Sequence, residues 1–213
     1  MSGFNMRVTP EIEALTDICR DHSTLDLSMY GKYDVKRGLR DINGKGVLAG
    51  LTQISNVQAT KVVDGKTVPC AGHLSYRGYD IKDLIKDYYT TRRLGFEETT
   101  YLLLYGVLPK KDEMEAFKRL LANQRSLPTN FVRDVIMKAP SKDIMNVLSR
   151  SVLTLYCYDK DPDNISLPNV MRQCLNLISV FPLISVYGYH AYNHYVCGHS
   201  LYIHNPRKSL STA

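Results

Sequence analysis

The chain has 213 residues, of which 44% are hydrophobic and 23% are charged, and its formal net charge is +6. This length and composition are typical of a globular protein with a sizeable core, and they exclude an intrinsically disordered chain. The basic residues alternate with acidic ones, as in Lys110-Lys111-Asp112-Glu113. Such a pattern favours solvated helix faces over a nucleic-acid interface, so we expect no nucleic-acid partner.

The N-terminus and the cysteines indicate the compartment. Met1 is followed by polar and charged residues without the apolar segment of a signal peptide, which predicts a cytoplasmic protein. The five cysteines are odd in number and contain no Cys-x-x-Cys pair, so we expect reduced thiols. Residues 173–190 carry no Asp, Glu, Lys or Arg, but they include Pro182 and several polar residues. We therefore predict a buried core helix there, and no membrane partner.

The first part of the chain predicts one helix, a connector and a small sheet. Thr9 can cap a first helix, Pro10 suits its first turn, and residues 22–46 predict an irregular connector. Residues 47–76 are rich in β-branched residues and short alternations, which predicts a small antiparallel β element. Asp64-Gly65 lies inside it and is a strong signal for a two-residue hairpin turn, because both central positions need a positive φ.

From Tyr79 onward, helical patterns dominate. Ile81, Leu84, Ile85 and Tyr88 are spaced to share one face of a helix. Further helices are predicted at residues 96–105, before Gly106, at residues 112–125, before Leu127-Pro128, and at residues 131–137, before Pro140.

Two longer segments carry most of the remaining hydrophobic residues. Ser141 is the predicted N-cap of a helix over residues 141–158, and Ser166 is the predicted N-cap of a second over residues 166–195, kinked at Pro182. The second has apolar residues on nearly every side, which predicts burial all round, against the chain's own core or a partner. Because no repeat or flexible linker is visible, we do not divide the chain by sequence.

Several segments, in a fixed order, carry a resemblance to a known family. They are Gly38-Leu39-Arg40-Asp41, Gly46-Val47-Leu48-Ala49-Gly50, Ser75-Tyr76-Arg77-Gly78-Tyr79-Asp80-Ile81, Phe96-Glu97-Glu98 through Leu104-Tyr105-Gly106, Asp143-Ile144-Met145 through Arg150-Ser151, Pro168-Asn169-Val170 through Gly188-Tyr189, and Ser209-Leu210-Ser211-Thr212-Ala213. Together they resemble the citrate synthase family, in its bacterial form, over roughly residues 15–213. The match ends in the middle of a segment of the family.

The resemblance implies a mainly α fold, the multi-helical large domain of citrate synthase with a small antiparallel β element near residues 47–76. It also implies a reaction that joins acetyl-CoA to oxaloacetate and gives citrate and CoA, without a cofactor. An aspartate and two histidines perform the acid and base chemistry in the family. Their motifs, His-x-Asp-His, Gly-Pro-x-His-Gly-Gly and Gly-His-Arg, do not occur in this sequence.

The missing motifs limit what is expected of this chain. In the family they lie beyond the point where this sequence ends, so we expect residues 1–213 to be the N-terminal part of the large domain, with the small catalytic domain absent. We assign no catalytic residue and expect the isolated chain to be inactive.

Arg40 is the one residue for which the resemblance implies a ligand role, since the similar arginine of the family approaches a phosphate of CoA. Arg40 is equally compatible with a surface position or a structural salt bridge. Tyr76-Arg77-Gly78-Tyr79 is interpreted as structural, with Gly78 relieving the backbone at a turn and Arg77 paired with a nearby carboxylate.

A cluster of possible zinc ligands occurs near the end of the chain: His190, His194, Cys197, His199 and His204. His190 and His194 are one helical turn apart, and imidazole with thiolate is a competent zinc set. The later spacing is irregular and no paired Cys-x2-Cys is present, so we favour a half-solvated helix end and predict no metal site.

The resemblance also suggests partners and alternatives. The helices near 141–158 and 166–195 resemble those that form the family's homodimer interface, so we expect a homodimer, with acetyl-CoA and oxaloacetate as ligands of the complete enzyme. A non-catalytic helical dimerisation module derived from the enzyme is one alternative. A 2-methylcitrate synthase is another.

Overall fold

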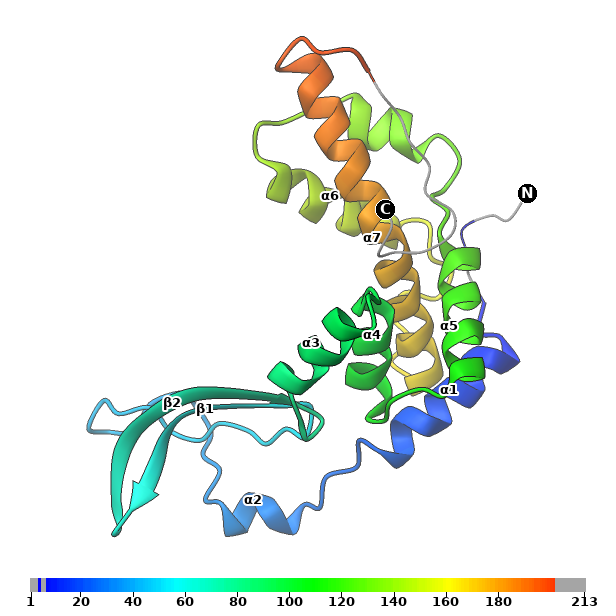
Figure 1. Cartoon of the computed structure of the whole chain (residues 1–213). Helices are drawn as coiled ribbons and strands as arrows, with labels where there is room; N and C mark the ends of the chain where they lie inside the picture. Colours follow the sequence, from blue (N-terminus) through cyan, green and yellow to red (C-terminus); the bar gives the residue numbers. More distant parts are fainter. Residues whose placement is uncertain (1–3, 5–6, 202–213) are drawn as a thin grey trace. The chain divides into compact units, whose positions relative to one another are not determined.

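The computed structural model describes residue 4 and residues 7–201. This part of the chain forms eight helices and one three-stranded antiparallel sheet, which confirms the predicted mainly α fold with a small β element (Figure 1). The chain separates into two compact units. One comprises residues 1–16 and 110–213, and the other comprises residues 17–109, so the first helix, α1 (Pro10–Asp21), contributes residues to both.

The sheet of the second unit is a hairpin with a short third strand. Strands β1 (Ser55–Val63) and β2 (Lys66–Tyr76) pair antiparallel, and β2 also pairs with β3 (Tyr79–Asp80). The hairpin turn lies at Asp64 and Gly65, whose φ angles are 50° and 74°. This confirms the prediction from Asp-Gly, because a two-residue turn with both φ values positive matches the twist of the flanking strands.

The boundaries of the sheet differ from the prediction. Strand β1 begins at Ser55 rather than near residue 47, and β3 was not predicted. A short helix, α2 (Ser28–Lys32), interrupts the connector that was predicted to be irregular throughout. Among the described residues before β1, Arg40 and Gly46 form an isolated β-bridge.

Helices α3 (Ile81–Thr90) and α4 (Phe96–Tyr105) complete the second unit. Asp80 caps α3, because its carboxylate accepts a hydrogen bond from the backbone N–H of Lys82 at 2.8 Å. Leu84 is buried on this helix, whereas Ile85 is exposed, so the predicted apolar face is wrong at Ile85. Helix α4 ends at Tyr105, before Gly106, as the sequence predicted, and Gly106 adopts the left-handed conformation.

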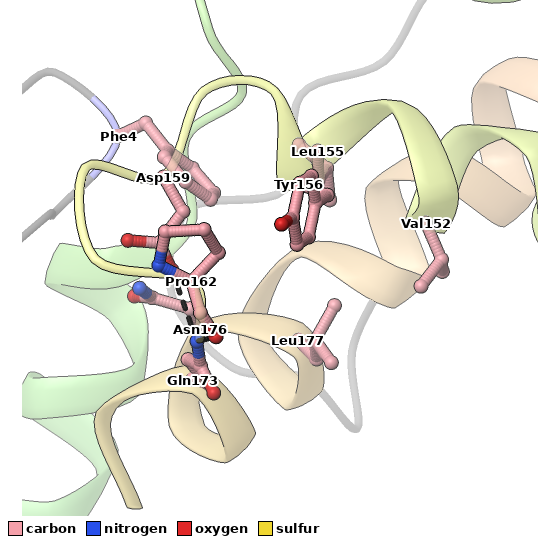
Figure 2. A pocket seen from close by; sticks show the side chains of 9 residues that line it. All are labelled: Phe4, Val152, Leu155, Tyr156, Asp159, Pro162, Gln173, Asn176 and Leu177. Carbon is pink, nitrogen blue, oxygen red and sulfur yellow. Dashed lines mark hydrogen bonds between the residues drawn. The ribbon is translucent and has the colours of Figure 1, made fainter. Parts of the chain in front are cut away.

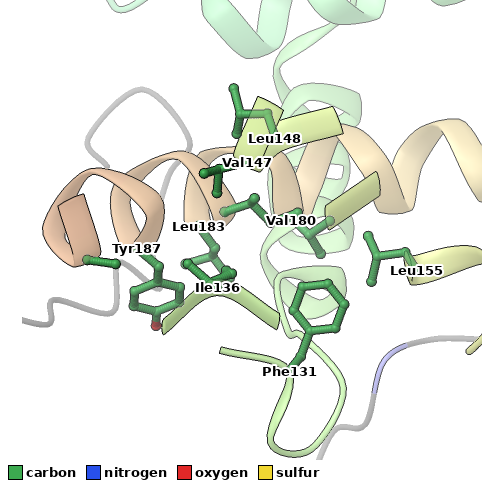
Figure 3. Packing of buried hydrophobic residues seen from close by; sticks show 10 residues of the cluster. Phe131, Ile136, Val147, Leu148, Leu155, Val180, Leu183 and Tyr187 are labelled. Carbon is green, nitrogen blue, oxygen red and sulfur yellow. The ribbon is translucent and has the colours of Figure 1, made fainter. Parts of the chain in front are cut away.

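The first unit contains α5 (Lys111–Gln124), the π-helical segment η1 (Val132–Met137), α6 (Ile144–Tyr156) and α7 (Leu167–Tyr195). A hydrophobic core lies where η1 and α6 meet the middle of α7 (Figure 3). Side chains of all three elements and of the residue before η1 meet there: Phe131, Ile136, Val147, Leu148, Leu155, Val180, Leu183, Ile184, Tyr187 and Ala191. Helix α5 also packs against α7.

One prediction about the long helices needs correction, and a second is met only in part within this chain. The N-cap of α6 is Asp143 rather than Ser141, because the Asp143 carboxylate accepts a hydrogen bond from the Asn146 N–H at 3.0 Å. Helix α7 is not buried all round by the described residues. Val170, Phe181 and Tyr189 are exposed, while Leu175, Leu183 and Ile184 are buried. The helix continues through Pro182.

By length and composition alone, α7 could cross a membrane, and it is the single helix of the described residues that passes this test. Half of its most apolar stretch is buried inside the chain. Burial of this kind is typical of a core helix, whose apolar residues contact protein on one side.

Candidate functional site

Arg40 lies on a tight, exposed loop of the second unit. Its Nη1 donates a hydrogen bond to the carbonyl oxygen of Gly44 at 2.9 Å, and Asp41 N–H donates to the carbonyl of Lys45 at 2.8 Å. Gly44 has a φ of 78°, which lets the loop turn back on itself. Among the described residues Arg40 forms no ion pair, so the predicted salt-bridge alternative has no counterpart there.

Arg40 is exposed and uses one of its N–H groups for a hydrogen bond within the loop. Much of its guanidinium therefore faces solvent. A guanidinium with free donors suits a phosphate oxygen geometrically. The same hydrogen bond also gives Arg40 a local role, because it closes the loop.

Arg77 and Gly78 form the two-residue turn that joins β2 to β3, with φ angles of 49° and 89°. The Arg77 guanidinium donates to the carbonyl of Leu103 from Nε at 3.2 Å and from Nη2 at 2.9 Å. It also donates to the carbonyl of His22 at 3.1 Å and to the hydroxyl of Ser23 at 3.2 Å. Arg77 thus joins the end of α1 and the end of α4 to the sheet, all within the second unit.

The predicted structural role of Arg77 therefore has a physical basis, but the predicted carboxylate partner is wrong. Two of the three acceptors are carbonyls at helix ends, that of Leu103 in the last turn of α4 and that of His22 just after α1, where a cation is also favoured by the helix dipole. The third acceptor is the Ser23 hydroxyl. Gly106 follows directly after α4, and a Cβ added there would lie 2.8 Å from the Cβ of His22. Close packing and hydrogen bonding therefore act together at this junction.

The histidine-rich segment begins at the C-terminal end of α7. His194 Nδ1 donates to the carbonyl of His199 at 2.8 Å, and the rings of His194 and Tyr195 contact each other edge to face. A hydrogen bond with Cys197 is the first cause that raises the pKa of Tyr192. Within residues 7–201 no group of three His, Cys, Asp or Glu side chains could hold a metal ion. His204 of the same cluster lies outside the described residues.

A buried ion pair in the first unit was missed by sequence reasoning. The Arg172 side chain is 1% exposed, and its Nη2 lies 2.9 and 2.7 Å from the two carboxylate oxygens of Asp159. Its Nε donates to the Asn169 side-chain oxygen at 2.9 Å. The available signal was that Arg172 is the one formally charged residue of the Leu167–Tyr195 segment. Buried charges of this kind are almost always paired.

Opposing effects set the ionisation of Asp159. Burial alone raises the pKa of its carboxyl group, whereas hydrogen bonds from Arg172, from the backbone N–H of Asp161 and from Gln173 lower it. The net result is a pKa below the ordinary value, so the group is a carboxylate near neutral pH. It is held by its cation, Arg172.

A cavity of about 150 Å³ lies beside this ion pair, between α6 and α7. Figure 2 shows the side chains that line it. Its apolar wall includes Val152, Leu155 and Leu177. Polar groups at the cavity bond within the protein: the Tyr156 hydroxyl donates to Asp163 at 3.0 Å, and Gln173 donates to the carbonyl of Pro162 at 2.9 Å. The described residues therefore present no pair of free acid and base groups at this cavity.

Comparison with protein families gives a match over most of the chain. A family model described as "Citrate synthase, C-terminal domain" matches residues 39–213. Among curated proteins, the chain is 27% identical over 150 residues to 2-methylcitrate synthase 1 of Corynebacterium glutamicum, covering 70% of this chain and 34% of that protein. It is 35% identical over 132 residues to the citrate synthase of Haloferax volcanii, covering 61% of this chain and 29% of that protein.

Solved structures give the same result. The structure of citrate synthase from Pyrobaculum aerophilum superimposes with a TM-score of 0.59 at 26% identity, covering 82% of this chain and 42% of that one. Citrate synthase from Thermotoga maritima gives a TM-score of 0.53 at 27% identity, covering 83% and 39% of the two chains. This chain spans about a third of the length of the curated relatives above and about 40% of the solved chains.

Proposed function

The chain belongs to the citrate synthase family, and from this premise we propose that it is part of an enzyme that converts acetyl-CoA, oxaloacetate and water to citrate and CoA. The observation that carries the proposal is the match of the family model to residues 39–213 together with a mainly helical fold of the same kind. The proposed enzyme is cytoplasmic and uses acetyl-CoA as a substrate, with no cofactor.

The proposed role of these 213 residues is that of a scaffold, the N-terminal part of the large domain, without the small catalytic domain. In support, the three histidine motifs are absent from the sequence, and the ionisable groups described above hold the fold. We expect no release of CoA when the purified chain is mixed with acetyl-CoA and oxaloacetate, as measured with a thiol reagent. A complete citrate synthase, such as that of Thermotoga maritima, is the positive control. Turnover by the isolated chain would refute the scaffold role.

Two alternatives remain open. Similar proteins include 2-methylcitrate synthases of Corynebacterium glutamicum and Shewanella oneidensis, which supports propionyl-CoA as an alternative substrate. One methylene changes binding by only about 1–3 kcal/mol, so rates with the two acyl-CoA substrates must be compared in a complete enzyme. A non-catalytic dimerisation module is the second alternative. The nucleotides after the Ala213 codon separate it from the enzyme, since a reading frame that continues into the histidine motifs excludes the module.

The proposed homodimer uses the outer faces of α6 and α7. Met145, Leu153 and Tyr156 are 69%, 73% and 54% exposed, and they follow one face of α6 at helical spacing. Phe181 and Tyr189 are 40% and 54% exposed on α7. Exposed apolar side chains grouped on neighbouring helices are typical of an interface between subunits.

Sedimentation of the 213-residue chain tests the dimer. We expect a dimer for the unchanged chain and a monomer for Leu153→Asp and for Phe181→Asp. Leu94→Asp is the control, because Leu94 is equally apolar and 60% exposed but belongs to the other unit. A chain that sediments as a monomer, or a dimer that survives both substitutions, contradicts the proposed interface.

We also propose that Arg40 contacts a phosphate of CoA. The support is its exposed guanidinium on a compact loop. Calorimetric titration of CoA into the chain, compared with Arg40→Ala, tests the contact, and Arg37→Ala is a control with an exposed arginine three residues away. Equal affinities for both variants would leave Arg40 with its role inside the loop.

A further inference from the structure

The loop closed by the bridge between Arg40 and Gly46 contains Asn43 followed by Gly44, the one Asn-Gly pair in the sequence. Asparagine is a thermolabile residue, because the backbone nitrogen of the next residue can attack its side-chain amide. A glycine in the next position leaves that nitrogen accessible, since it has no Cβ to hinder the approach. Asn43 and Gly44 are both exposed, so water reaches this peptide bond from outside.

The hydrogen bond of the Asn43 side chain favours attack on its carbonyl carbon. Asn43 Oδ1 accepts a hydrogen bond from the backbone N–H of Lys45 at 2.9 Å, which turns the side chain toward the following residues. A donor on a carbonyl oxygen stabilises the negative charge that develops there during attack. The Asn43 amide nitrogen, which is the leaving group, forms no hydrogen bond among the described residues and is therefore free to depart into solvent.

The backbone of the same loop opposes the reaction. Gly44 N–H, whose nitrogen is the nucleophile, donates to the carbonyl of Asp41 at 2.9 Å. The carbonyl of Gly44 accepts a hydrogen bond from Arg40 Nη1, also at 2.9 Å. Gly44 is therefore held at both its N–H and its carbonyl, and its nitrogen becomes available only when the loop opens locally.

We propose that Asn43 is a site of spontaneous deamidation whose rate is limited by the hydrogen bond from Arg40 to Gly44. The Gly44 nitrogen attacks Asn43 Cγ and forms a C–N bond, the bond from Cγ to Nδ2 breaks, and the proton of the Gly44 nitrogen leaves with the amide as ammonia. Water then adds to either carbonyl of the resulting succinimide and opens the ring to aspartate or isoaspartate. No oxidant or reductant takes part, and a neutral amide becomes a carboxylate.

The product changes the electrostatics around Arg40. The new carboxylate joins that of Asp41 in the loop that positions the guanidinium, and isoaspartate also lengthens the backbone between Asn43 and Gly44. A negative charge in this loop opposes the approach of a second anion. The effect on a phosphate rests on the CoA contact proposed above for Arg40, whereas deamidation itself does not.

Incubation of the purified chain near neutral pH, followed by peptide mass spectrometry and enzymatic isoaspartate methylation, tests the site. We expect conversion at Asn43 and none at Asn56 or Asn130, which are also exposed but precede the bulkier Val57 and Phe131. Equal conversion at either reference asparagine would contradict the proposal. So would an unchanged Asn43 over a period in which the chain unfolded in urea is converted.

A pair of arginine variants tests the control by the loop. Arg40→Ala removes the hydrogen bond to the Gly44 carbonyl and is expected to speed conversion of the folded chain by about threefold to tenfold. Arg37→Ala is the matched control, because it removes an exposed arginine that precedes the loop, and its rate should equal that of the unchanged chain. In urea all three chains should react at one rate. Equal rates of the folded chain with and without Arg40 would reject the limiting hydrogen bond.

Calorimetric titration of CoA tests the consequence for an anion. Asn43→Asp imitates one product and is expected to weaken CoA by about twofold to fivefold, whereas Asn56→Asp, which adds the same charge on β1, should leave the affinity unchanged. Equal affinities of these two variants would contradict an effect of the new charge on Arg40. If the unchanged chain binds no CoA, the contact proposed for Arg40 fails together with this consequence, and the mass spectra still decide whether Asn43 is deamidated.

Discussion

Replacing Arg77 with methionine tests the junction between the sheet and the helix ends of the second unit. The substitution keeps an unbranched side chain and removes four hydrogen bonds, of 2.9 to 3.2 Å. Two of these share the carbonyl of Leu103, so three acceptors lose a charged donor. At about 1 kcal/mol for each acceptor once water replaces the donor, the expected loss is about 3 kcal/mol. Arg77→Lys, which retains one donor group, is expected to lose about 2 kcal/mol.

Hydrogen–deuterium exchange is the suitable assay, because it reports local opening and does not require the two units to unfold together. A loss of 3 kcal/mol corresponds to an increase of about 150-fold in exchange rate for backbone amides of residues 18–24 and 100–106. Peptides from α6 serve as an internal reference.

Arg92→Met is the matched control for Arg77→Met. Arg92 also has a positive φ, at 51°, and lies in the same unit, but its side chain is exposed and donates no hydrogen bond among those described. We expect its exchange pattern to match that of the unchanged chain. If Arg77→Met leaves residues 18–24 and 100–106 equally protected, the hydrogen bonds of Arg77 do not hold this junction together.

Four further predictions concern stability. Asp159→Asn leaves the buried Arg172 without its charged partner and should lower the free energy of unfolding by about 3–5 kcal/mol, measured by urea titration. The pKa of Asp159 is lowered in the folded state, so its carboxylate contributes to the free energy of unfolding above the unfolded pKa, about 3.9. This contribution disappears as the pH falls through the folded pKa. The unchanged chain should therefore lose stability in acid more steeply than Asp159→Asn. Gly106→Ala should lower the thermal midpoint more than Gly38→Ala does. Both glycines have a positive φ, but only a Cβ added at Gly106 would lie 2.8 Å from the Cβ of His22. Equal effects of the two substitutions would exclude the contact with His22. Leu183→Ala should cost about 2–5 kcal/mol by leaving a core cavity, whereas Leu94→Ala, at an exposed position outside the proposed dimer interface, should change urea unfolding of the chain by less than about 0.5 kcal/mol.

The sequence predicted those features that depend on residues close together in the chain. Asp64-Gly65 predicted a hairpin because a two-residue turn of this kind needs a positive φ at both positions, and the structure has it. Residues 96–105 predicted a helix that ends before Gly106, and α4 has the same bounds. The ordered segments also predicted the family, which the family model confirms. Turn geometry, helical period and sequence motifs each depend on residues that are close together in the chain.

Tertiary structure decided which residues far apart in sequence meet. Arg77 donates to carbonyls 55 and 26 residues away, a choice that no local pattern specifies, and so the predicted carboxylate partner was wrong. Arg172 pairs with Asp159 because the loop after α6 folds back onto α7. The spacing of apolar residues predicted that α7 and α3 are helices with apolar faces. Packing alone decides that Phe181 and Ile85 are exposed while Leu183 and Leu84 are buried. Burial and long-range hydrogen bonds depend on neighbours that the chain brings together in three dimensions, and a helical period alone does not name those neighbours.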